Sequence, residues 1–150
     1  MSLPTQILPH HHRHCDDLFV AAEEAVQRHD WAVAEKSFAR FHAQMRAHFQ
    51  AEEEMLFPAF EAATGMNAGP TQMMRYEHEQ MRSLLTQLAG ACAAHDDAGY
   101  AGAAETLLML MQQHNMKEEN ILYPMCDQAL GAGAERICAE MSTLLAEGHA

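Results

Sequence analysis

A chain of 150 residues, of which 49% are hydrophobic, is long enough to form one domain with its own buried core, which excludes a disordered chain. Nine Lys and Arg against 21 Asp and Glu give a formal net charge of −12 with histidine neutral. Such a surface repels phosphate groups, so we expect neither nucleic acid nor a membrane surface as a partner. The sequence does not identify a protein partner.

Secretion and membrane insertion are not expected. The first residues lack the basic and apolar regions of a signal peptide, and no apolar run approaches the ~18 residues of a membrane span. The four cysteines are isolated from one another along the chain, as expected for reduced thiols in a cytoplasmic protein: Cys15, Cys92, Cys126 and Cys138.

The first half of the chain predicts two helices. The first would begin near Pro9 and run to about Arg28, with an inward side at spacings of four and three: Cys15, Phe19, Ala22 and Val26. Asp30 is a good N-cap for the second helix. We expect Pro58 to kink or end that helix near Phe57, and Gly65 to stop it. Its inward stripe is Phe38, Phe41, Met45, His48, Glu52, Met55 and Ala59.

The second half repeats this arrangement. A third helix is predicted from Pro70, with the inward stripe Met74, His78, Met81, Leu85 and Leu88. Asp96 or Asp97 would cap a fourth helix, which ends at Gly131 and Gly133. Its stripe is Leu107, Met111, His114, Glu118, Ile121 and Met125. A shorter amphipathic helix over about residues 134–146 closes the chain.

No segment shows the period-two alternation of a strand. Four long helices joined by short connections predict an all-α, up-down-up-down four-helix bundle over about residues 9–131, with the additional C-terminal helix packed on it. Residues 1–150 are expected to form this one domain.

An internal repeat relates the two halves. Residues 48–65 and 114–131 align without a gap, each with an aromatic residue, Phe57 or Tyr123, before the proline. The identical pairs are His48/His114, Glu52/Glu118, Glu53/Glu119, Leu56/Leu122, Pro58/Pro124, Ala63/Ala129 and Gly65/Gly131. Each half therefore offers a histidine and a carboxylate one helical turn apart, on one face.

The bundle topology brings these residues to one level. The starts of the first and third helices share an end with the finishes of the second and fourth, so four histidines and two glutamates meet on inward faces: His12, His48, Glu52, His78, His114 and Glu118. A single inward histidine is usually an ordinary core residue. Two buried carboxylates without a cation are costly, however, so the set as a whole predicts a metal site.

Several neighbouring histidines could supply the ligand from the first helix. His12 precedes Cys15, Phe19 and Ala22 by three, seven and ten residues and shares their face, whereas His14 points with Leu18. We therefore favour His12. The default for the other histidines is a surface or loop position: His10, His11, His29, His42, His95 and His149.

Six nitrogen and oxygen ligands are too many for one tetrahedral ion and suit two ions. Helix order pairs His12 with His48 on one ion and His78 with His114 on the other, with both glutamates bridging. Neither the Glu-x-x-His motif of ferritin-like carboxylate bundles nor the His-Glu-x-x-His motif of zinc proteases occurs, since Arg82 follows His78-Glu79 where a second histidine would be needed.

Over about residues 10–131 the chain resembles the hemerythrin-like, or HHE cation-binding, family. The resemblance is carried by four motifs: His12-Arg-His-Cys-Asp16, His48-Phe-Gln-Ala-Glu52-Glu53 with Leu-Phe-Pro, Glu77-His78, and His114-Asn-Met-Lys-Glu118-Glu119 with Leu-Tyr-Pro. It implies two oxo- or hydroxo-bridged iron ions, with Zn or Mn as possible substitutes. The four histidines would be terminal ligands and Glu52 and Glu118 bridging ligands.

The chain departs from the oxygen carriers of this family at two positions. Met74 stands where they have a further histidine, and Glu118 stands four residues after His114 where they have an aspartate at five. A thioether is a poor ligand for hard iron, so we interpret Met74 as a packing residue. The set resembles the four-His, two-Glu variant of iron-centre repair and of iron- or oxygen-sensing domains.

We therefore expect a non-haem di-iron protein that senses, binds or scavenges O2, NO or peroxide, or handles iron. Its partner would be a small diatomic ligand or peroxide, and no catalytic residue is predicted. The alternatives are a redox enzyme acting on NO or peroxide at the di-iron centre, and a helical interaction module with a vestigial site.

Overall fold

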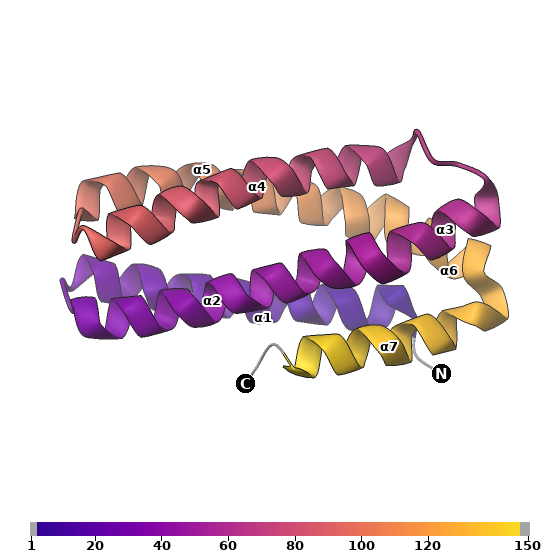
Figure 1. Ribbon diagram of the computed structural model, residues 1–150, viewed down its shortest axis with the longest axis horizontal. Coiled ribbons are helices and arrows are strands. Elements are labelled where there is room, and N and C mark those ends of the chain that lie inside the picture. Colours follow the sequence, from indigo (N-terminus) through magenta and orange to yellow (C-terminus); the bar gives the residue numbers. More distant parts are fainter. Residues whose placement is uncertain (1–2, 148–150) are drawn as a thin grey trace.

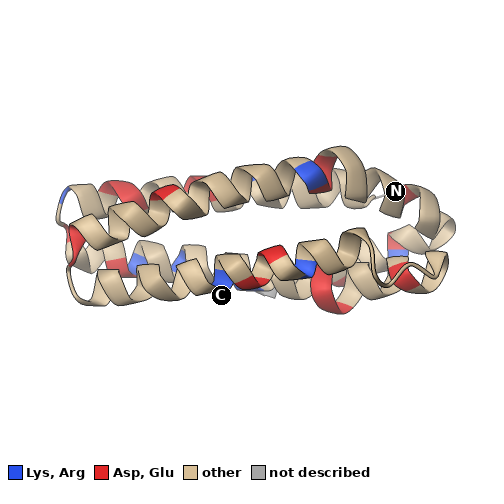
Figure 2. Cartoon of the chain, turned by 90° about the horizontal axis from the view of Figure 1, so that it is seen from above, with Lys and Arg blue, Asp and Glu red and all other residues tan. Residues whose placement is uncertain are grey.

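The structure, a computed structural model, describes residues 3–147, and all the regular structure in this range is helical. Four long helical segments run up, down, up and down, and a shorter helix lies along one end of the bundle (Figure 1). The all-α, four-helix prediction is confirmed. None of the helices in residues 3–147 is both long and apolar enough to cross a membrane. The few Lys and Arg lie scattered among Asp and Glu along the helices (Figure 2).

The first helix, α1 (Pro4–Gln27), begins earlier than the predicted start at Pro9. Pro4 occupies the first turn, where a missing N–H needs no intrahelical partner. Pro9 lies in the helix at the loss of one backbone hydrogen bond. Two contacts hold the added turn in place: Leu8 is fully buried, and the Thr5 hydroxyl donates a hydrogen bond to the Asp127 carboxylate.

The second long segment is α2 (Trp31–Ala51), the π-helical turn η1 (Glu52–Leu56) and α3 (Phe57–Thr64). The Asp30 carboxylate accepts a hydrogen bond from the Val33 N–H, and Gly65 ends α3 in the left-handed conformation with φ of 73°, as predicted for both residues. The expected break near Phe57 is a change of helix type, and the helix continues past Pro58.

The second half has the same plan: α4 (Pro70–Ala93), α5 (Asp97–Lys117), the π turn η2 (Glu118–Leu122) and α6 (Tyr123–Leu130). A 3₁₀ turn, η3 (Gly131–Gly133), leads into α7 (Ala134–Glu147). Of the two candidate caps for α5, Asp96 is the residue that caps it, because its carboxylate accepts a hydrogen bond from the Gly99 N–H.

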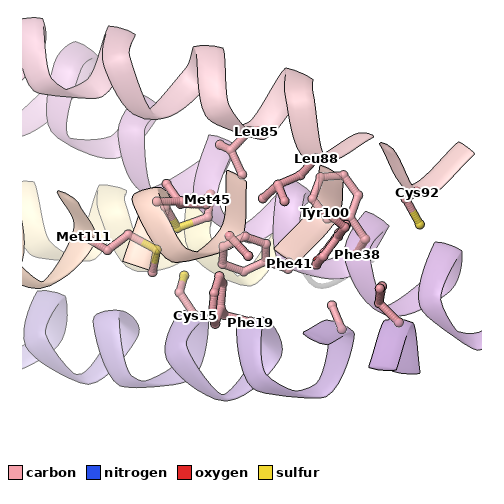
Figure 3. Packing of buried hydrophobic residues seen from close by; sticks show 14 of the residues in the cluster. Cys15, Phe19, Phe38, Phe41, Met45, Leu85, Leu88, Cys92, Tyr100 and Met111 are labelled. Atoms are coloured by element: carbon pink, nitrogen blue, oxygen red, sulfur yellow. The ribbon is translucent and has the colours of Figure 1, made fainter. Parts of the chain in front are cut away.

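The four long segments pack as a square. α1 lies against α2 and α5, and α4 lies against α5 and α2, while α7 packs on α1, α2 and η1. Toward the α1–α2 and α4–α5 turns the interior is a cluster we call the distal core (Figure 3). It includes Cys15, Phe19, Phe38, Phe41, Met45, Phe49, Met81, Leu85, Leu88, Tyr100, Leu107 and Met111.

The opposite end has its own apolar cluster, the proximal core, which α7 completes. It includes Leu8, Ala51, Leu56, Phe57, Phe60, Met74, Leu122, Tyr123, Cys126, Cys138 and Met141. Met74 is 3% exposed and belongs to this packing, as the sequence suggested. Each long segment has a buried histidine where its distal-core residues give way to proximal-core residues, so a polar layer lies between the two cores: His12, His48, His78 and His114.

Candidate metal centre

The polar layer brings together the six residues that the sequence singled out. Every one of them is at most 5% exposed, and each of the four long segments contributes: His12, His48, Glu52, His78, His114 and Glu118. They form two overlapping groups whose ligand atoms lie within 4.8 Å of one another. The first group is Glu52, His78, His114 and Glu118, and the second is His12, His48 and Glu118. The histidines are therefore grouped in the pairs that helix order suggested.

Several nitrogen and oxygen atoms in this layer that could bind a metal lack a hydrogen bond. Among the residues that the structure describes, Glu52 Oε1, His78 Nε2, His114 Nε2 and Glu118 Oε2 are buried and have no hydrogen-bond partner. His78 Nε2 lies 3.0 Å from Glu52 Oε1, but the angles are not those of a hydrogen bond. Buried polar groups are nearly always satisfied, so this convergence fits atoms that share a cation.

In three of the histidines the other ring nitrogen, Nδ1, is hydrogen-bonded to a carboxylate. His12 Nδ1 lies 2.7 Å from Glu119, His78 Nδ1 lies 2.7 Å from Glu53, and His114 Nδ1 lies 2.8 Å from Glu77. A carboxylate only accepts, so each Nδ1 carries a proton, and when the ring is neutral its Nε2 presents a lone pair to the centre. This is the arrangement of metal-ligating histidines in proteins.

Without a metal, protons take the place of cations. Burial lowers the pKa of His12, but the hydrogen bonds that its ring donates to Glu118 and Glu119 outweigh it and raise the pKa to about 9. For His78 burial is likewise outweighed, by Glu52 and Glu53, and its pKa is also raised to about 9. Because the neutral imidazole is the ligand, metal binding near neutral pH would release protons from these rings.

The carboxylates are held ionised by the same contacts. Burial raises the pKa of Glu52, yet the charge of His48 and hydrogen bonds within the layer bring it well below its usual range. For Glu53 the effect of burial is outweighed by His78 and Arg82, which lower the pKa to about 2. Both carboxylates are therefore available as anions at neutral pH.

The two π turns set the direction of the side chains that follow the glutamates. In an α-helix of 3.6 residues per turn, a residue five positions on points about 140° away. Here the Phe57 N–H bonds to the Glu52 carbonyl and the Tyr123 N–H to the Glu118 carbonyl, so each aromatic residue turns back toward the centre. The same change of phase corrects the predicted stripe: Ile121 is 57% exposed and Leu122 is buried instead.

Tyr123 is part of the centre, and sequence analysis did not identify it. Its hydroxyl oxygen lies 2.6 Å from Glu52 Oε2 and 2.9 Å from Glu118 Oε1, and its proton is shared between the two carboxylates. The same oxygen is 3.2 Å from His12 Nε2 and 3.4 Å from His48 Nε2. The available signal was the difference between Phe57 and Tyr123 at equivalent positions of the repeat.

His11 is also in the polar layer, and the expectation of a surface position was wrong. It is 5% exposed, with Nδ1 2.8 Å from His48 Nδ1 and Nε2 2.7 Å from Gln44 Oε1. Helix α1 lies at a corner between α2 and α5, so it buries two faces, with His11 toward α2 and His12 toward η2. Burial, with a smaller contribution from His48, lowers the pKa of His11 to about 3, so the ring is neutral.

The remaining histidines lie outside the centre. His10 is exposed and His14 is half-buried, which agrees with the choice of His12. The side chains of His29 and His95 are more than half exposed, and His42 is half-buried. His149 is outside the described residues.

A small cavity of about 10 Å³ adjoins the layer on the side of the distal core. Such a volume is close to the space that one water molecule requires. The polar lining consists of the three imidazoles His12, His48 and His114 and the amide of Asn115. The remaining lining is apolar or sulfur-containing: Cys15, Met45, Phe49, Met81 and Met111.

An all-helical bundle with imidazoles and carboxylates gathered in its interior defines a class of metal-binding four-helix proteins. The chain belongs to the hemerythrin HHE cation-binding domain family, whose model matches residues 3–126. Hemerythrin domains bind non-haem iron, and the His and Glu groups described above could hold a metal ion.

The chain is similar to the iron-sulfur cluster repair protein YtfE of Enterobacter sp. (strain 638). It is 30% identical over 137 residues, and the match covers 79% of this chain and 61% of the relative. The chain thus spans less than two thirds of that protein. No solved structure matches the chain.

Proposed function

We propose that the chain is a non-haem di-iron protein whose two ions occupy the polar layer. His78 and His114 would hold one ion and His12 and His48 the other, with Glu52 and Glu118 shared between them. The observation that carries this proposal is that Nε2 of His78 and His114 and one oxygen each of Glu52 and Glu118 are buried together without a hydrogen bond, while Nδ1 of His12, His78 and His114 is bonded to a carboxylate. When bound, iron would supply one-electron chemistry and open coordination positions.

The protein's own residues fix the donor atoms before any ion arrives. Glu53, Glu77 and Glu119 orient three imidazoles, and Tyr123 holds the inner carboxylates through its hydroxyl. Three outer carboxylates behind neutral rings increase ligand basicity and favour a cationic centre. A donor set of nitrogen and oxygen without thiolate suits iron, and also admits Zn or Mn.

The cavity beside the layer supports a small exogenous ligand. Its volume, about 10 Å³, suits a diatomic molecule such as O2 or NO better than a larger substrate. Apart from the three imidazoles of the layer, its lining offers one amide and apolar or sulfur-containing side chains and no charged carboxylate or ammonium group, which favours a neutral ligand. We propose sensing, binding or scavenging of such a ligand, or the handling of iron that the name of the repair protein suggests. The four free cysteines suit the reducing cytoplasm.

The test is metal loading followed by spectroscopy. Metal-free protein is loaded with ferrous iron under anaerobic conditions, freed of excess metal and analysed for iron per chain. Mössbauer and optical spectra are then recorded after exposure to air. We expect two irons per chain and the spectrum of a coupled ferric pair, and well under one iron per chain would contradict the proposal.

A second experiment separates a binding protein from an enzyme. The reduced, loaded protein is mixed in a stopped-flow instrument with O2, NO or hydrogen peroxide in separate runs. A binding or sensing protein gives one stable new spectrum, whereas an enzyme that turns over NO or peroxide returns to its starting spectrum while the reactant is consumed.

A further inference from the structure

Of the four histidines in the proposed di-iron site, His48 has no carboxylate behind it. Its Nδ1 faces Nδ1 of His11 at 2.8 Å. The two rings are inclined by 11° with centroids 5.0 Å apart. Because the nitrogen separation is shorter than a van der Waals contact of about 3.5 Å, the rings meet edge to edge, as an N–H···N hydrogen bond requires.

The position of each proton in this contact follows from Gln44. The Gln44 Oε1 atom lies 2.7 Å from His11 Nε2, and a carbonyl oxygen can only accept, so the proton of the neutral His11 ring is on Nε2. His11 Nδ1 is then an acceptor, and the proton between the two rings belongs to His48 Nδ1. The Nε2 atom of His48 is left with its lone pair, 3.6 Å from Glu52 Oε1.

We propose that His11 and Gln44 are positioning residues that set the tautomer and orientation of His48 through a neutral hydrogen-bond relay. This inference rests on the proposed di-iron function. The relay does for His48 what Glu119, Glu53 and Glu77 do for His12, His78 and His114.

The internal repeat shows where the two halves differ. His12 and His78 are equivalent residues on α1 and α4, and the residues that precede them are His11 and Glu77. Glu77 bonds to His114, and His11 bonds to His48, the equivalent of His114. One half of the site therefore has a neutral imidazole where the other has a carboxylate.

The two metal positions are consequently unequal although each has two histidines as direct ligands. The His78/His114 position has carboxylates behind both rings, whereas the His12/His48 position has one carboxylate and one neutral relay. A neutral partner makes the coordinating nitrogen less basic than an anionic partner does. The His78/His114 position fills first, and the His12/His48 position binds the second ion more weakly.

The test is an anaerobic titration of the metal-free protein with Co²⁺, followed by its visible absorption, and with ⁵⁷Fe²⁺, followed by Mössbauer spectroscopy. Four substitutions separate the contributions. His11→Leu removes the relay, His11→Gln keeps an acceptor toward His48 and a donor toward Gln44, and His11→Glu places a carboxylate here as Glu77 does in the other half. His10→Leu is the matched control, because His10 is the exposed neighbour.

We expect two binding steps for the wild-type protein. His11→Leu should weaken the second step by ~10–100-fold and leave the first unchanged, while His11→Gln and the His10→Leu control stay within a few-fold of wild type. His11→Glu should tighten the second step and bring the two Mössbauer signals closer together. Gln44→Leu, which breaks the relay one link further out, should weaken the same step and serves if His11→Leu does not fold.

The relay is overturned if second-step binding is unchanged in both His11→Leu and Gln44→Leu, or if glutamine at position 11 is no better than leucine. Equal weakening of both steps would also contradict it, because it indicates general damage to the bundle. A wild-type protein that takes up no metal would instead overturn the di-iron proposal itself, so the two failures are distinguishable.

Discussion

Phe57 and Tyr123 stack on His78 and His12, respectively, with ring centroids 5.8 Å apart in both pairs. They are equivalent residues of the internal repeat, placed by equivalent π turns. Only Tyr123 has a hydroxyl, and that hydroxyl bonds to the carboxylates of both halves. The centre of the repeat is therefore asymmetric at this point as well as at His11.

Replacing Tyr123 by Phe should test the hydroxyl without disturbing the stacking, because Phe57 already occupies the matching place. Glu52 and Glu118 would lose a donor, and we expect the metal-free protein to lose ~1–3 kcal/mol of unfolding free energy. Urea unfolding in the presence of a chelator measures the change. Tyr76→Phe makes the same chemical change at a side chain that is 63% exposed and should alter stability by less than ~0.5 kcal/mol. Equal effects of the two substitutions would argue against the hydroxyl's role.

Glu119→Gln should weaken metal binding through His12. The glutamine keeps the size of the side chain but offers His12 Nδ1 a neutral partner in place of a carboxylate, now 2.7 Å away. We expect a loss of ~10–100-fold in metal affinity, measured by competition with a chromophoric chelator. The exposed Glu54→Gln, two residues after Glu52, removes the same charge and should leave the affinity unchanged. If Glu54→Gln weakened binding as much, net charge would explain the effect.

Metal removal should lower the free energy of unfolding, by an amount set by the logarithm of the free metal concentration relative to the dissociation constant. An ion that binds only the folded state contributes ~2.7 kcal/mol when its free concentration is 100 times its dissociation constant. For a chain of this size that corresponds to about 5–10 °C in Tm for each ion. Thermal unfolding with and without chelator tests this, and an unchanged Tm in protein shown to contain iron would contradict it.

The metal-free protein should be most stable near pH 6.5. The pKa values of His12 and His78 are raised to about 9, so their contribution is complete below the unfolded value of 6.5 and is lost as the pH rises through 9. The pKa of His11 is lowered to about 3, so its contribution is complete above 6.5 and is lost as the pH falls toward 3. Urea midpoints across this range, measured with chelator, should therefore pass through a maximum.

Loaded protein provides the contrast for that experiment. Bound ions replace the protons on His12 and His78, the two imidazoles whose pKa is raised. Stability should therefore not fall between pH 6.5 and 9 and should instead increase as metal binding tightens. If the metal-free and loaded proteins both declined over this interval, titration of the centre could not be the cause.

The six predicted residues of the layer could be found from sequence because helical period and the repeat act together. A period of 3.6 residues places His48 with Glu52 and His114 with Glu118 on one face, and antiparallel topology then brings the two faces to one level. That prediction requires regular α-helix only as far as the glutamates.

The errors have two physical sources. One is the pair of π turns, which shift the phase after Glu118 so that Leu122 rather than Ile121 faces inward. The other is a helix with two buried faces: assigning α1 a single inward stripe left His11 on the surface, whereas its position between α2 and α5 buries His11 and His12 side by side. Neither the extra residue in a turn nor the number of neighbouring helices can be deduced from hydrophobic spacing alone.

The distal core contains Phe41, Leu85, Leu88 and Leu107, all fully buried and in a different cluster from the carboxylates of the polar layer. Each such side chain contributes ~1.5–3 kcal/mol, and none of that contribution depends on a cation. Removal of metal should therefore lower the protection of backbone amides from hydrogen exchange first in α3, α6 and α7. The amides around Phe41 and Leu88 should keep their protection. Ions could then leave and return through one loosened end while the chain as a whole stays folded.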